Sequence, residues 1–280
     1  MSRKFHVRRD APKSTTDPWS SIPERLGEIT GFKRQVVMVY SHKPGISDSL
    51  NEYCADAARF CNSKHGPGSC VGLSTVLPGE AGATKVLERA FSRREITGVK
   101  LHAHVQVVRP NDPKCDEIYE TCIKHGKSIL FHAGRAPNSP GHAQDSDDLC
   151  SYRYIEDVMK RHPQLRLCIP HLGSDEESEY FALLQRFENL YLDTANTHSD
   201  YLGQLNDSVS IRETIRRGIL ASSNQIMYGS DFPNIPHTLY TEVRAWDKYD
   251  LPPDVLNKLL TKNAETFYGF EASTRTVAVL

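Results

Sequence analysis

Four short apolar segments of this chain each end in polar side chains that could do chemistry. They read Gly-Val-Lys-Leu-His at residues 98–102, Ile-Leu-Phe-His-Ala-Gly at 129–134, Cys-Ile-Pro-His-Leu-Gly at 168–173 and Ile-Met-Tyr-Gly-Ser-Asp-Phe-Pro at 226–233. Neutral imidazoles and carboxylates bind divalent cations, and both groups transfer protons at neutral pH. These residues therefore point to a metal-assisted or acid–base reaction.

The elements that must position these side chains are strands. A buried parallel strand is a continuous apolar run of about four to eight residues bounded by turn formers, and all four segments fit that description. Further strands are predicted at 35–40, 70–76 and 190–194, with helices at 49–62, 83–94, 114–125 and 254–267 between and after them. Strands that present polar groups at the same end are typical of a (β/α)8 barrel, whose active site lies at the carboxyl ends of its strands.

Length and composition agree with one catalytic domain. The 280 residues predict a single α/β TIM barrel over residues 1–270, with an incomplete or irregular first strand, followed by a C-terminal tail at 271–280. The net charge of −1 favours a small-molecule partner over nucleic acid, and no apolar stretch reaches the roughly 18 residues that span a membrane. Seven cysteines without a Cys-x-x-Cys pair indicate reduced thiols and a cytoplasmic protein.

The order and spacing of the four motifs resemble the strand ends of the amidohydrolase-related branch of the amidohydrolase superfamily. The sequence Asn-Ala-Glu-Thr-Phe-Tyr-Gly at 263–269 is similar to the closing helix of that branch. The resemblance implies a metal-dependent hydrolase or a carboxy-lyase, because the branch contains both. Barrels of this branch often form dimers, so we also expect a homodimer.

The resemblance also implies roles for three strand-end residues. His132 matches the fifth-strand histidine that binds metal, and Asp231 matches the aspartate that serves as ligand and proton carrier. His171 matches the sixth-strand histidine, which orients or deprotonates water in mononuclear members and binds a second ion in binuclear ones. A bridging glutamate or carboxylated lysine is not evident, so we favour the first role. The alternatives are a hydrogen-bonded core histidine for His132 or His171, and a turn cap for Asp231.

Two basic residues near the same strand ends are candidates for binding a substrate carboxylate. Lys100 could hold such a group as a point charge or form a structural ion pair, and Arg135 could bind it bidentately or be a solvated loop residue. His102 and His104 alternate with apolar residues, so they share one strand face with Lys100. That face either lines the barrel mouth or packs outward. This His-x-His lies in a different strand from the metal motif of the family.

The first strand departs from the family pattern. Members open with an apolar strand that ends in His-x-His and supplies two metal ligands, whereas this chain has His6 followed by Val7 and Arg8. Arginine has no lone pair for a metal, so one ligand is missing. The chain could begin further upstream, bind metal weakly through His6, His132 and Asp231, or work without metal and use Arg8 to hold an anionic substrate. A fourth alternative is a barrel that has lost catalysis and serves as a binding protein.

These observations predict a hydrolase with one bound divalent metal, zinc being our first choice. It would attack an amide, lactone or related bond of a small, carboxylate-bearing molecule with activated water. His171 would take the proton of the water, and Asp231 would deliver a proton to the leaving group. The competing prediction is the non-oxidative decarboxylation of an unsaturated or aromatic acid, in which a proton is added to carbon after carbon dioxide leaves.

Overall fold

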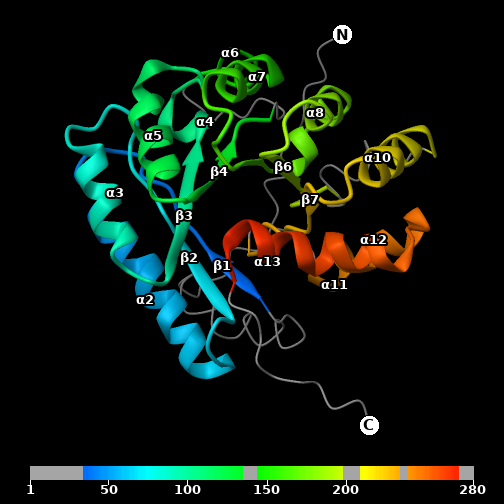
Figure 1. Ribbon diagram of the computed structural model, residues 1–280, viewed down its shortest axis with the longest axis horizontal. Coiled ribbons are helices and arrows are strands. Elements are labelled where there is room, and N and C mark those ends of the chain that lie inside the picture. The colour runs from blue at the N-terminus through cyan, green and yellow to red at the C-terminus, as the bar shows by residue number, and fades with distance from the viewer. Residues whose placement is uncertain (1–33, 135–143, 198–208, 234–238, 271–280) are drawn as a thin grey trace, which may run out of the picture.

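The structure of the protein is a computed structural model. It describes residues 34–134, 144–197, 209–233 and 239–270. In these ranges seven strands form one parallel sheet, and their order in the sheet is their order in the chain (Figure 1). The strands are β1 (Gln35–Val37), β2 (Cys70–Ser74), β3 (Ile96–His102), β4 (Ser128–His132), β5 (Leu167–Ile169), β6 (Leu190–Asp193) and β7 (Ile226–Met227). Sequential parallel strands with intervening helices are the arrangement expected of the predicted barrel.

The register of the central strands brings their polar ends together. β3 pairs with β4 from Gly98 opposite Ser128 to His102 opposite His132. β4 pairs in turn with β5, with Leu130 opposite Cys168. Because all these strands run in the same direction, their carboxyl ends lie at one edge of the sheet. The predicted common edge for the strand-end motifs is therefore confirmed.

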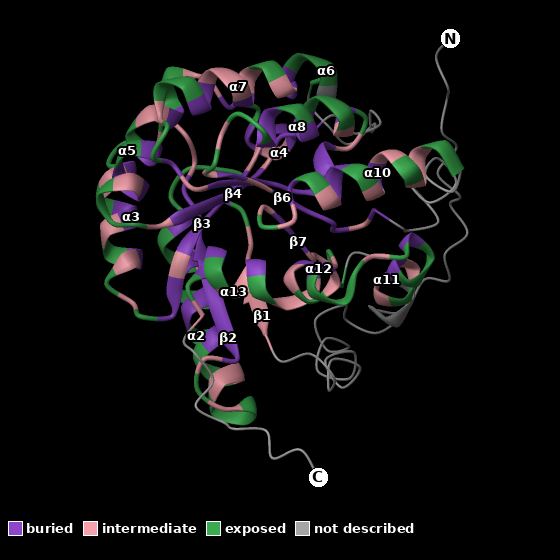
Figure 2. Cartoon of the chain, turned by 45° about the vertical axis from the view of Figure 1, so that its right-hand side comes forward, coloured by how far each residue is buried: buried purple, intermediate pink, exposed green. Residues whose placement is uncertain are grey.

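Helices cover the outer face of the sheet and bury one stripe each, which Figure 2 shows as purple bands on otherwise green and pink ribbons. α7 is typical, since Ile155, Val158 and Met159 are buried on one side and the Ser151 hydroxyl accepts from the Arg153 backbone N–H at its start. The helices are α2 (Ser47–His65), α3 (Ala83–Phe91), α4 (Ala103–Gln106), α5 (Asp116–Lys124), α6 (Ser146–Leu149), α7 (Tyr152–Arg161), α8 (Glu177–Leu184), α10 (Val209–Ala221), α11 (Leu239–Ala245), α12 (Pro253–Asn257) and α13 (Asn263–Tyr268).

Short 3₁₀ turns complete the connections. They are η2 (Pro113–Cys115), η3 (His171–Gly173) and η4 (Trp246–Tyr249). Among the described residues no helix is both long and apolar enough to cross a membrane.

The two faces of the strands belong to different clusters of buried side chains. Leu101 and Phe131 pack in the large cluster that contains the inward stripes of the helices. Leu130 and Cys168 pack instead with Met227 and with Phe267 of α13. Successive strand residues point to opposite faces, so Lys100, His102 and His132 share the inner face with Leu130. The histidine face therefore lies on the inner side of the sheet, opposite the large cluster formed with the helices, and Phe267 of α13 packs on this inner side.

The final helix and the end of β3 differ from the sequence prediction. The helix predicted at 254–267 is divided into α12, a π-helical turn η5 (Lys258–Lys262) and α13. Within that turn the Leu259 carbonyl accepts a hydrogen bond of 2.7 Å from the Tyr228 backbone N–H, which ties the helix to the chain after β7. β3 ends at His102 and α4 begins at once. The expected first strand and the expected tail at 271–280 lie outside the described residues. The domain boundary expected at residue 270 stays a prediction.

Gly98 is required by the close pairing of β3 and β4. A Cβ at this position would lie 2.5 Å from the Ser128 backbone oxygen. We expect Gly98→Ala to lower the free energy of unfolding by about 1–3 kcal/mol, the usual cost of overpacking. Urea denaturation measures it, with Lys85→Ala on the exposed face of α3 as a control that changes stability by less than about 0.5 kcal/mol. An unchanged midpoint for Gly98→Ala would contradict the register given for these strands.

Candidate active site

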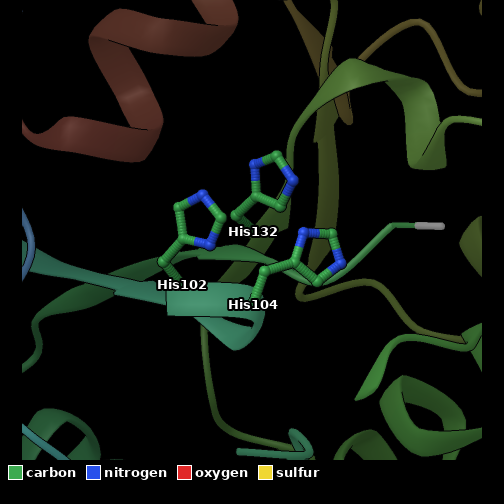
Figure 3. Close-up of side chains that lie close together, drawn as sticks. All are labelled: His102, His104 and His132. Carbon is green, nitrogen blue, oxygen red and sulfur yellow. The ribbon is translucent and has the colours of Figure 1, made fainter. Parts of the chain in front are cut away.

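Four aromatic rings form a row along the carboxyl ends of the strands. Tyr40 meets His102 edge-on at 4.8 Å between ring centroids, and His102 stacks on His132 at 4.1 Å with an interplanar angle of 7°. His132 then meets His171 at 4.8 Å. Figure 3 shows His102 and His132 beside His104, which lies in α4 two residues after the end of β3. Side chains from three neighbouring strand ends thus face one another.

His132 is kept neutral by its surroundings. Burial lowers its pKa well below the usual value of 6.5, and the nearby His102, His171, Lys100 and His104 lower it further. A neutral imidazole carries a lone pair on one ring nitrogen, which is the form that binds a metal or accepts a proton.

His171 has a defined tautomer. Its Nδ1 lies 2.6 Å from the Ala195 carbonyl oxygen, which can only accept, so Nδ1 carries the proton. The Nε2 therefore carries the lone pair, and it lies 3.2 Å from Nδ1 of His132. The backbone at His171 is left-handed, with φ of 59°, and this turn out of β5 aims the ring along the sheet edge.

The pair of His132 and His171 places a candidate metal ligand beside a proton acceptor. Nδ1 of His132 lies 3.2 Å from Nε2 of His171, within hydrogen-bond distance. The Ala195 carbonyl holds Nδ1–H of His171, which keeps Nε2 as the acceptor. The donor set is imidazole, which suits zinc, iron or manganese among other ions.

Asp193 organises the loop that holds His171, and the sequence analysis missed it. Its Oδ1 accepts from the Ala195 backbone N–H at 2.8 Å and from the His171 backbone N–H at 3.4 Å. Burial raises its pKa, while the hydrogen bonds and the charges of His171 and Lys100 act in the opposite direction. A Cβ on Gly229 would lie 2.9 Å from the same carboxylate oxygen, so glycine permits this approach. Asp193 ends the apolar run of β6, which is the signal that could have identified it, as it could have identified Tyr40 near β1.

Lys100 lies inside the barrel below the histidines. Only 7% of its surface is exposed. Burial lowers its pKa, and the charges of Asp193, Asp231 and Cys168 raise it again in part. Lys100 lies two residues before His102 and shares its face of β3.

Asp231 follows β7 at the same edge. It is exposed and has a left-handed backbone with φ of 54°. Its charge acts on both Lys100 and Tyr40, which places it on their side of the barrel. In the same turn the Ser230 hydroxyl accepts from the Phe232 backbone N–H at 3.3 Å.

Three candidates from the sequence analysis, His6, Arg8 and Arg135, lie outside the described residues. The structure therefore brings together His132, His171, Lys100 and Asp231 and leaves the proposed roles of the other three as predictions. It adds His102, His104, Asp193 and Tyr40 to the same region.

Comparisons with known proteins agree with this arrangement. An uncharacterized TIM-barrel protein from Bordetella bronchiseptica superposes with a TM-score of 0.68 at 16% identity, covering 90% of this chain and 83% of that one. A 5-carboxyvanillate decarboxylase from Novosphingobium aromaticivorans, complexed with manganese and a nitrobenzoic acid, gives 0.61 at 15% identity, with coverage of 88% and 79%. These likenesses establish the TIM-barrel fold.

A third similar structure is a protein from Pseudomonas putida assigned as 2-pyrone-4,6-dicarboxylic acid hydrolase, with a TM-score of 0.61 at 16% identity and coverage of 90% and 88%. No curated protein sequence matches the chain. The sequence profile of the amidohydrolase family matches residues 43–270. Since this match spans most of the chain and all seven described strands except β1 lie within it, the chain belongs to the amidohydrolase family.

Proposed function

We propose that this protein is a metal-dependent hydrolase that cleaves an amide, lactone or related bond in a small, carboxylate-bearing molecule. The observation that carries the proposal is the pair of His132 Nδ1 and His171 Nε2, 3.2 Å apart at the strand ends, above the buried Lys100. This arrangement combines a cation-binding group, a proton acceptor and a fixed positive charge within one barrel mouth.

The ion is one divalent metal, and we propose zinc. His132 and Asp231 would hold it together with His6 of the first-strand sequence. When bound, such an ion polarises a carbonyl and lowers the pKa of a water molecule towards 7. The low pKa of His132 keeps its lone pair available for this purpose at neutral pH.

The side chains supply positioning and proton transfer. The lone pair on Nε2 of His171 accepts a proton from the attacking water, while the Ala195 carbonyl holds Nδ1–H and keeps the tautomer. The proton that His171 takes from the water would pass to the leaving group through Asp231. Lys100 holds the substrate carboxylate, and Arg8 and Arg135 are further candidates for that contact. In this proposal His171 removes the proton of the water, Asp231 protonates the leaving group and Lys100 holds the substrate.

The alternative reaction is a non-oxidative decarboxylation of an unsaturated or aromatic acid. Loss of carbon dioxide needs the same binding site for a carboxylate. Asp231 or His171 then supplies the proton that takes the place of the lost carboxylate on carbon. The structural similarity to a 5-carboxyvanillate decarboxylase favours testing this reaction next. A barrel that binds a ligand without turnover is the third alternative.

Turnover in H₂¹⁸O with zinc or manganese present separates these reactions. We would use 2-pyrone-4,6-dicarboxylate and 5-carboxyvanillate as probes, because similar structures are associated with them, and then a panel of lactones and amides of small acids. Hydrolysis places ¹⁸O in the product and releases no carbon dioxide. Carbon dioxide release without ¹⁸O incorporation would replace the hydrolase proposal by the decarboxylase. Binding without turnover of any probe would favour a binding protein.

Lys100→Met is expected to weaken substrate binding. The variant keeps an unbranched chain of similar length in the barrel but removes the charge that attracts the substrate carboxylate. We expect KM to rise about tenfold or more while kcat changes less, because a uniform binding contact is lost. Steady-state kinetics measure this, with the exposed Lys85→Met as control. A loss confined to kcat would instead place Lys100 in the chemical step.

We also propose that the protein works in the cytoplasm on a small molecule, with no nucleic acid partner. The cysteines of the described residues are all free thiols, which supports a reducing compartment. The homodimer stays a prediction, which sedimentation equilibrium of the full chain would test.

A further inference from the structure

Three histidines from two neighbouring strands converge beside the proposed catalytic pair. His102 ends β3, His104 lies in α4, and His132 ends β4. One ring nitrogen from each lies within 4.8 Å of the others. Figure 3 shows the three rings gathered at the ends of their strands. His104 is 2% exposed, so this is an enclosed cluster and not a surface patch.

The turn at the end of β3 is what places His104 in the cluster. The chain leaves the extended conformation after His102, which has φ of −147° and ψ of 104°, and enters α4 at once. The Gln106 side-chain oxygen accepts from the His102 backbone N–H at 2.8 Å. Its amide nitrogen donates to the carbonyls of Ser41 at 2.9 Å and Val76 at 3.0 Å. The buried Gln106 side chain makes all three of these hydrogen bonds and so fixes the turn between His102 and His104.

Outer contacts also orient the rings. Nε2 of His104 lies 3.0 Å from the Cys150 sulfur, a residue with no exposed surface. His132 stacks on His102 and contacts His104 edge-on at 5.3 Å. Histidines that bind metals are commonly held by such a partner on the second ring nitrogen, which sets the direction of the first.

The three ring nitrogens lie within reach of one ion but wider apart than its ligands. Two nitrogens on a tetrahedral zinc at about 2.0–2.1 Å lie roughly 3.3–3.4 Å apart, and the nitrogens here lie within 4.8 Å of one another. Rotation of the side chains on binding would close this gap and turn the stacked rings of His102 and His132 towards a common point. Three imidazoles are also the ligand set of a catalytic zinc with an open coordination position.

We propose that His102 and His104 are metal ligands of this chain, binding the divalent cation together with His132. They would supply what the first-strand sequence lacks, since Arg8 stands where the amidohydrolase-related pattern has its second histidine. The inference rests on the proposed function for the presence of an ion and adds which residues hold it. The His-x-His of β3 and α4 then serves this barrel in place of the missing ligand of the first strand.

Metal binding to the full-length protein tests the assignment without any substrate. The protein is stripped with a chelator, dialysed and titrated with zinc by calorimetry, and its zinc content is measured by mass spectrometry. We expect about one ion per chain in the wild type. Loss of a hydrogen-bond partner that only orients a metal ligand costs about 10- to 100-fold in affinity, so we expect the loss of a ligand itself, in His102→Ala or His104→Ala, to weaken zinc binding by about 100-fold or more. His65→Ala, which changes an exposed histidine at the end of α2, should bind as the wild type does.

X-ray absorption at the zinc edge of the unmutated protein gives a second readout that no misfolded variant can distort. Scattering from three imidazoles supports the proposal. Retention of wild-type affinity by both variants, with His6→Ala and His132→Ala losing the ion, would overturn it and leave the proposed hydrolase intact. A wild-type protein that binds no ion but turns over substrate would overturn the inference and the metal requirement together, and not the hydrolase activity.

Discussion

His132→Asn is expected to abolish turnover, with kcat/KM falling by about 10³-fold or more. This ring is the common member of the pair with His171 and of the cluster with His102 and His104. Asparagine is neutral and polar but has no imidazole lone pair, so both cation binding and the contact with His171 are lost. A 10³-fold loss corresponds to about 4 kcal/mol of transition-state stabilisation. Steady-state kinetics with the substrate found by the isotope experiment, together with zinc content, measure the effect.

The matched control is His162→Asn. That histidine is also mostly buried, with 11% of its side chain exposed, and its Nε2 lies 3.2 Å from Asp116. It follows α7 and belongs to a different part of the molecule. We expect it to lower stability while kcat/KM stays within about threefold. If His132→Asn kept kcat/KM within tenfold of wild type, the strand-end histidines would not be the catalytic centre.

Asp231→Asn is expected to lower kcat by about 10²- to 10⁴-fold, the usual contribution of a positioned acid or base. Asparagine keeps the size of the side chain and tolerates the left-handed backbone found at this position. Folding stability should therefore change little, and the loss belongs to proton delivery and cation binding. Comparing the change in kcat with the change in the urea midpoint separates an effect on catalysis from an effect on folding stability.

Asp250→Asn is the control for this substitution. Asp250 is likewise exposed and left-handed, with φ of 45°, but it follows η4 away from the strand ends. Its variant should keep both stability and kcat. Equal kinetic parameters for Asp231→Asn and the wild type would show that the aspartate is a turn residue and would remove it from the mechanism.

The sequence was sufficient to predict the common edge of the strand-end motifs. Each motif follows a continuous apolar run, and such runs form parallel strands only when helices cover their outer face. His102 opposite His132 and the contact of His132 with His171 follow from that arrangement. The alternation of Lys100, Leu101 and His102 predicted that the two charged or polar residues share a face. It could not decide between the inner and outer face, because both faces of these strands are buried.

The remaining features depend on backbone turns that the residue pattern does not encode. His104 joins the cluster because β3 stops at His102 and Gln106 fixes the next turn, whereas alternation alone extends the strand past Ala103. Asp193 acts through the backbone of Ala195, two residues away, and of His171, 22 residues away in the chain. The π-helical turn before α13 contains Leu259, whose carbonyl accepts a tertiary hydrogen bond from the Tyr228 backbone N–H.

Anomalous diffraction from crystals of the zinc-loaded protein tests the central claim most directly. The account predicts one strong peak at the carboxyl ends of the strands, about 2.0–2.2 Å from a ring nitrogen of His132, with Lys100 and Asp231 facing the same space. A zinc-loaded crystal with no peak near His132, or with the ion bound elsewhere on the molecule, would contradict it.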